Sequence, residues 1–155
     1  WIGAGQPARA RHAAATGLRL ASVLAVASGA LLWWASDALA RLYAAQPAVV
    51  ALAAPLLVWV AAYHVADAIQ AVCMFVLRCY RITLAPLLVY CVMLWGLGLT
   101  GGFWLAYEGW PGQAPLRTPT AFWITSAVAL ALTSALFAFM LLRATHPRRS
   151  SAVGA

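Results

Sequence analysis

Tyr63 and Asp67 lie one helical turn apart inside a long apolar stretch of the sequence. A phenol four residues before a carboxylate can donate a hydrogen bond to it, and the amide of Gln70, three residues after, can do the same. Burial favours the protonated carboxyl group, whereas a nearby cation or hydrogen bonds favour the carboxylate. A carboxylate balanced between these effects can exchange a proton for Na⁺ or for a cationic ligand, which is the chemistry of a proton relay or an ion site.

These three residues fall on one stripe of a helix together with Trp59 and Met74, at about 100° per residue. We expect Asp67 and Tyr63 to form a cation-binding pair, with Gln70, Trp59 and Met74 lining a cavity beside them. The alternative is a polar cluster that only joins helices, because interhelical hydrogen bonds also stabilise membrane proteins. Trp and Met at such positions are also common in packed cores.

His64 lies beside this stripe, and we favour a packing or hydrogen-bonding role for it over a ligand role, while keeping it as a cavity-lining candidate. Asp67 has no second acid or nucleophile nearby, so the sequence does not predict an enzyme. Cys73, Cys79 and Cys91 form no CxxC pair with a neighbouring histidine. We therefore expect them to be packing residues, with no bound cofactor and with Na⁺ at Asp67 as the metal candidate.

The composition indicates that all these residues are carried by membrane helices. The chain has 155 residues, of which 65% are hydrophobic and 8% are charged, and its mean hydropathy is +0.87. Soluble domains carry about 25% charged residues. A carboxylate in such a span costs about 2.5–3.5 kcal/mol on insertion scales and usually faces a bundle interior or a water-filled cavity. Asp67 is therefore a functional candidate.

The arginines predict how these helices are oriented. The net charge is +7, and all ten basic residues are arginines placed between apolar runs, which favours membrane orientation over nucleic-acid binding. Cytoplasmic loops are enriched in arginine and lysine, so we expect both termini to be cytoplasmic. One set of connections carries Arg9, Arg11, Arg19, Arg78, Arg81, Arg143, Arg148 and Arg149, and the other carries Arg41 and Arg117.

The apolar runs divide the chain into four spans, each close to the roughly twenty residues that a bilayer requires. The first residue is Trp1, and we expect the chain to be part of a longer protein. The sequence predicts, in order, a cytoplasmic loop over 1–14, a transmembrane helix over 15–35, a periplasmic connection over 36–47, a long transmembrane helix with Asp67 over 48–78, a cytoplasmic turn over 79–83, a transmembrane helix over 84–106, a periplasmic loop over 107–119, a transmembrane helix over 120–142 and a cytoplasmic tail over 143–155.

The block YHVADAIQAVCMFVLRCYRITLAPLL, residues 63–88, resembles the multidrug and toxic compound extrusion (MATE) family in its NorM-like branch. That family has a Tyr-x-x-x-Asp-Ala-x-Gln helix, then a Leu-Arg-Gly-Tyr-x-Asp-Thr-like turn and a proline. It also has a Tyr-Trp-x-x-Gly-Leu-Pro-x-Gly segment and a Gly-x-Gly…Ala-Arg loop. The matching residues are Tyr63, Asp67, Ala68, Gln70, Leu77, Arg78, Tyr80, Thr83, Pro86, Trp95, Gly98, Leu99, Gly102, Gly3, Gly5, Ala8 and Arg9.

This resemblance implies an all-α architecture of twelve helices in two six-helix bundles, with this chain forming about helices nine to twelve of the second bundle. It also implies a cation-coupled antiporter, driven by H⁺ or Na⁺, that exports drugs or organic cations by alternating access. Asp67 and Tyr63 would match the family's cation site. The expected partners are the drugs, the lipid bilayer and the preceding helices of the same transporter. Three residues depart from the family pattern: Cys79 replaces a glycine, Ile82 an aspartate and Thr100 a proline.

A second hypothesis is a small four-helix membrane protein that acts as an assembly or scaffold subunit. The third predicted span contains Gly96, Gly98, Gly101 and Gly102, whose missing side chains allow close helix approach. In this hypothesis the glycine face would be an association surface for a partner.

Overall fold

The computed structural model describes residues 1–109 and 112–146, and every regular element in these residues is a helix. In chain order the elements are α1 (Pro7–Trp34), α2 (Ser36–Tyr43), α3 (Pro47–Cys79), α4 (Leu84–Cys91), the π-helix η1 (Val92–Thr100), α5 (Gly101–Phe103), the π-helix η2 (Trp104–Glu108) and α6 (Thr120–Ala144). The segments α4, η1, α5 and η2 follow one another without a break and form one continuous rod, Leu84–Glu108.

Four of these helices are long and apolar enough to cross a membrane. They are Pro7–Trp34, Pro47–Cys79, Leu84–Glu108 and Thr120–Ala144. A helix satisfies all its backbone hydrogen bonds internally, which is the condition for crossing lipid. The expectation of an all-α, multi-pass membrane chain is confirmed.

The first helix begins earlier than the sequence reading predicted. The segment 1–14 was expected to be a loop, but α1 starts at Pro7. Proline suits the first turn of a helix because its missing N–H would have no partner there, and the alanine-rich residues that follow favour helix. At the other end of the chain, α6 extends to Ala144, and the part of the expected tail beyond residue 146 lies outside the described residues.

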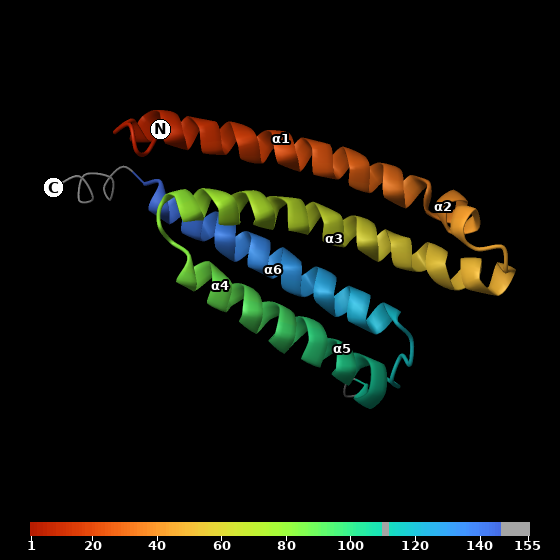
Figure 1. The fold of residues 1–155 in the computed structure, drawn as a ribbon. Helices are drawn as coiled ribbons and strands as arrows, with labels where there is room; N and C mark the ends of the chain where they lie inside the picture. The colour runs from red at the N-terminus through yellow and green to blue at the C-terminus, as the bar shows by residue number, and fades with distance from the viewer. Residues whose placement is uncertain (110–111, 147–155) are drawn as a thin grey trace.

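The helices form an open layer (Figure 1). The central helix α3 packs against α1 on one side and against α6 on the other, and α6 in turn packs against the rod that contains η1. The start of α1, the α3–α4 turn and the end of α6 lie at the same end of the molecule. From that turn, α3 and the rod diverge, with α6 between them.

Small residues and hydroxyl groups hold these helices together. A Cβ atom on Gly29 of α1 would lie 3.0 Å from Val65 Cγ2 of α3, so the two helices approach closely at this point. From α6, Thr125 Oγ1 donates to the Gly98 carbonyl of η1 at 2.8 Å, and Ser134 Oγ donates to the Ala66 carbonyl of α3 at 2.6 Å. Close approach and interhelical hydrogen bonds are the usual stabilising contacts between membrane helices, where the hydrophobic effect is weak.

A compact apolar core lies near the α3–α4 turn, where Cys73 and Leu77 of α3 contact Phe137 and Leu141 of α6. Cys73 is fully buried, as expected for a packing residue. Cys79 and Cys91 are exposed, so neither packs in the core of the described residues. Both lie on outward faces of their helices, which the one-dimensional apolar pattern does not distinguish from inward ones.

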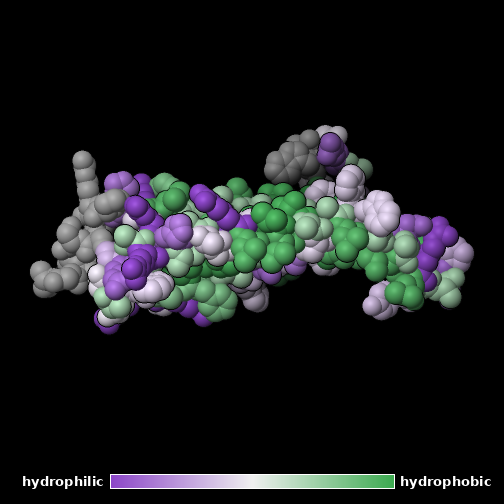
Figure 2. Space-filling view, turned by 90° about the horizontal axis from the view of Figure 1, so that it is seen from above, coloured by the Kyte–Doolittle hydropathy of each residue, from purple (hydrophilic) through white to green (hydrophobic). Residues whose placement is uncertain are grey.

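The outer surface is apolar over the middle of the molecule. Figure 2 looks onto the α1 side and shows hydrophobic side chains across the middle, with hydrophilic side chains toward both ends. Leu20, Val23 and Leu24 of α1 are each at least 60% exposed. A surface of this kind fits contact with lipid or with further helices.

Removing the Ser134 hydroxyl is expected to weaken the contact between α3 and α6. Ser134→Ala should lower stability by about 0.6 kcal/mol, the average for interhelical hydrogen bonds in a membrane protein, and lower the melting temperature of the detergent-solubilised protein. Ser22→Ala is the matched control, because Ser22 Oγ donates only to Leu18 of its own helix, at 2.7 Å. Equal melting temperatures for the two variants would show that the Ser134 bond does not stabilise the helix pair.

Candidate cation site

Asp67 lies in the second half of α3, about 16 Å along the helix from Arg78 at the basic end. Its side chain is exposed, and it lines a hollow of about 590 Å³ between α3, η1 and α6. We call this space the Asp67 hollow. Its walls are formed by Val60, Tyr63, His64 and Asp67 of α3, Leu94 and Leu99 of η1, and Phe122, Trp123 and Ser126 of α6.

Tyr63 lines the same hollow, as its spacing from Asp67 predicts. Its ring packs edge-on against Trp123 of α6, with ring centroids 6.1 Å apart and an interplanar angle of 86°. This is a favourable geometry for two aromatic rings. Within the described residues Tyr63 makes no hydrogen bond to Asp67, so the expected phenol–carboxylate bond is not formed in this structure.

Gln70 does not reach the hollow. It is only 4% exposed and lies on the face of α3 that also buries Ala66, Cys73 and Leu77. Successive side chains turn by about 100°, so Gln70 is about 60° from Asp67 around the helix. On a helix with neighbours on two sides, that angle separates a wall of the hollow from a packed interface, so Gln70 does not line the hollow in this structure.

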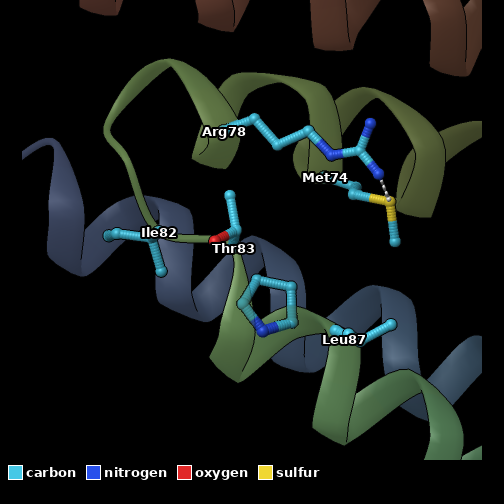
Figure 3. A pocket seen from close by; sticks show the side chains of 6 residues that line it. Met74, Arg78, Ile82, Thr83 and Leu87 are labelled. Carbon is cyan, nitrogen blue, oxygen red and sulfur yellow. Dashed lines mark hydrogen bonds between the residues drawn. The ribbon is translucent and has the colours of Figure 1, made fainter.

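The two ends of the predicted stripe also lie outside the hollow. Trp59 is half-buried and is not among the lining residues. Met74 lines a separate pocket at the α3–α4 turn, where Arg78 Nη2 donates to its sulfur at 3.4 Å (Figure 3). The stripe is longer than the hollow, and only its middle contributes to this space.

His64 has two roles in the structure. It lines the Asp67 hollow, and its Nε2 atom lies 2.9 Å from Ser28 Oγ of α1. The serine hydroxyl also lies 2.9 Å from the Leu24 carbonyl, to which it donates, so the imidazole N–H can donate to the serine oxygen. This bond ties the wall of the hollow to α1, which agrees with the hydrogen-bonding role favoured for His64.

Sequence reasoning missed the α6 side of the hollow, namely Phe122, Trp123 and Ser126. Phe122 and Trp123 lie at the start of a span, where aromatic residues are also typical of the membrane–water interface. Their presence in the sequence therefore does not indicate a cavity. Only the packing of α6 between α3 and η1 brings these residues opposite Asp67.

The hollow combines one carboxylate with aromatic rings and apolar walls. A carboxylate can hold a proton or a monovalent cation, and aromatic faces attract an organic cation. In the part of the chain that the structure describes, no group of three or more His, Cys, Asp or Glu side chains could hold a metal ion.

Comparison with known proteins gives a consistent assignment. The family model MatE matches residues 1–104. The chain is 39% identical over 139 residues to a probable multidrug resistance protein NorM of Aromatoleum aromaticum, covering 90% of the chain and 30% of that protein. It is 35% identical to the multidrug resistance protein NorM of Burkholderia vietnamiensis (100% of the chain, 32% of that protein) and 32% identical to PmpM of Pseudomonas aeruginosa (96% and 30%).

The chain thus spans about a third of the length of these relatives. No solved structure matches it. The family model covers residues 1–104, which include α1, α2, α3 and the Tyr63–Asp67 pair. The chain belongs to the MATE family.

Proposed function

We propose that this chain is part of a cation-coupled multidrug antiporter and that Asp67 is its coupling carboxylate. The observation that carries the proposal is the position of Asp67 in a hollow on a helix long and apolar enough to cross a membrane, beside Tyr63 and opposite Trp123. Family membership and the names of the relatives, which are multidrug resistance proteins, support the transport role.

In this proposal Asp67 alternately holds the coupling ion, H⁺ or Na⁺, and releases it as the drug leaves. Tyr63 orients the carboxylate when the helices close around the ion, and the rings of Trp123 and Phe122 offer apolar contact to an organic cation. Alternating access follows from rocking of one helix bundle against another. No bound cofactor and no enzymatic step are required.

The remaining partners are proposed from the surface and the charges. The exposed apolar face of α1 would contact lipid or the other helices of the transporter. The basic end of the molecule would face the cytoplasm of a bacterium, with the chain in the inner membrane, because arginine-rich connections are retained on that side.

Transport driven by an ion gradient is the direct test. Inverted membrane vesicles that contain the complete gene product should accumulate ethidium, a fluorescent organic cation, when an outwardly directed H⁺ or Na⁺ gradient is imposed. Uptake should stop when an ionophore collapses that gradient, and vesicles without the gene product provide the control. Uptake that needs neither gradient would contradict the antiporter proposal.

The assembly-subunit hypothesis is not favoured by the packing of the glycines. Cβ atoms built on Gly98, Gly101 and Gly102 would contact α6 of the same chain. Most of the glycine face is therefore occupied within the chain itself and is not available as an association surface for a partner.

A further inference from the structure

A second pocket, of about 140 Å³, lies at the basic end of the molecule where α3 turns into α4. Figure 3 shows Met74 and Arg78 extending from α3 on one side of it, with Thr83 and Leu87 on the other. We call it the Arg78 pocket; Ile82 and Pro86 complete its lining. It does not overlap the Asp67 hollow, since the two share no lining residue.

Arg78 brings a positive charge to this pocket, and among the described residues no acidic side chain pairs with it. Its guanidinium donates to Met74 Sδ at 3.4 Å and lies 5.4 Å from the centroid of the Phe75 ring, and neither group is an anion. The three acidic residues of the chain are Asp37 of α2, Asp67 of α3 and Glu108 at the end of η2, and none of them lines this pocket. A guanidinium has a planar fork of donors that fits a phosphate group.

Thr83 adds a second polar group to the lining. It is the N-cap residue of α4, where a threonine side chain usually accepts a bond from the helix backbone, but it makes no such bond here. The side chain is exposed at the pocket. A ligand can therefore bind this hydroxyl without breaking an N-cap hydrogen bond of α4.

An apolar surface continues from the pocket along α4. Leu84, Leu87 and Leu88 are 67%, 53% and 56% exposed, and they follow one another along the membrane-spanning rod. A free phosphate ion would gain nothing from this surface, whereas the acyl chain of a phospholipid would cover it.

The charge of this end favours an anionic lipid over a zwitterionic one. Arg81 follows in the same turn, and Arg11 of α1 lies close enough to influence Tyr80 of the turn. Clusters of basic residues at a membrane surface attract anionic headgroups within about a Debye length. An anionic phospholipid thus fits this site in three ways. Its phosphate suits the donors of the pocket, its negative charge suits the basic end of the molecule, and its acyl chains suit the exposed leucines of α4.

We propose that the Arg78 pocket binds the phosphate of one anionic phospholipid, with the guanidinium of Arg78 and the hydroxyl of Thr83 as donors and the acyl chains lying over the exposed leucines of α4. This site is independent of the transport proposal, because it uses none of the residues of the Asp67 hollow.

Native mass spectrometry of the complete gene product, purified in detergent, can count retained lipids. Phosphatidylglycerol and phosphatidylcholine of identical acyl chains are titrated in turn. Arg78→Gln removes the guanidinium and is expected to weaken phosphatidylglycerol binding about tenfold, the loss of one good charge-assisted hydrogen-bonding group. Thr83→Asp places a carboxylate at the pocket while offering α4 a good N-cap, so it should also weaken binding while the protein stays folded.

Arg143→Gln is the matched control, because Arg143 is an exposed arginine at the same end that does not line the pocket. It should change the affinity by less than about twofold, as isolated surface charges do. Preference for phosphatidylglycerol over phosphatidylcholine, lost in the two pocket variants and kept in the control, would support the site. Equal losses in Arg78→Gln and Arg143→Gln, no preference between the lipids, or displacement of the lipid by inorganic phosphate would each overturn it.

Discussion

Asp67→Asn is expected to abolish coupled drug export by the complete gene product while the protein still inserts and folds. The amide has nearly the same size but cannot bind and release a proton and holds Na⁺ weakly. Because Asp67 is exposed in its hollow, no buried ion pair or packed contact is lost. Gradient-driven ethidium transport should fall by at least about tenfold, the factor that corresponds to about 1.4 kcal/mol.

The matched control is Asp37→Asn. Asp37 of α2 pairs with Arg41 at 2.8 Å, both side chains are largely exposed, and neither lines the hollow. An exposed pair of this kind contributes about 0–1 kcal/mol, so transport should remain near the original rate. If Asp67→Asn keeps both its transport rate and its ion dependence, Asp67 is not the coupling carboxylate.

A side chain at Gly102 is expected to separate the rod from α6. A Cβ atom there would lie 2.5 Å from Phe122 Cδ1, 2.9 Å from Thr125 Oγ1 and 3.1 Å from Phe122 Cα. The last of these is a backbone atom, so a rotation of side chains cannot relieve the contact. Gly102→Ala should therefore destabilise the protein by about 1–3 kcal/mol, as overpacking does, and lower its melting temperature in detergent.

Gly96→Ala tests whether this effect comes from the contact. Gly96 lies one and a half turns earlier in the same rod, and a Cβ atom there would have no neighbour within 4 Å. Since alanine is the better helix former, this variant should be as stable as the original protein or slightly more stable. Similar melting temperatures for the two variants would mean that the α5–α6 contact is looser than the structure indicates.

The sequence was sufficient to predict four membrane helices, because length and hydropathy are properties of each segment alone. The sequence was also sufficient to predict that Tyr63 and Asp67 lie on the same side of α3, because residues four apart on a helix differ by only about 40° in direction. It did not predict the burial of Gln70, where about 60° is enough to place the side chain in the interface with neighbouring helices.

The other features of the site depend on contacts between segments far apart in the chain. Trp123 meets Tyr63 across 60 residues, and nothing in either local pattern indicates that α6 lies opposite this part of α3. The hydropathy pattern also does not predict that η1 is a π-helix. The π-helical form accompanies a hydrogen bond from Thr125 to the Gly98 carbonyl, which exists only after α6 has packed against the rod.

The π-helix η1 makes the rod tolerant of changes in chain length. Each of its hydrogen bonds closes over five residues in place of four, so the segment Val92–Thr100 holds more chain per turn than an α-helix. Deleting one residue within it can be absorbed by a return to α-helical bonding, with the flanking α4 and α5 kept in place. Leu94 and Leu99 of η1 form the wall of the hollow opposite Asp67. A natural insertion or deletion within η1 would therefore change the shape of the hollow, while the flanking helices α4 and α5 keep their positions.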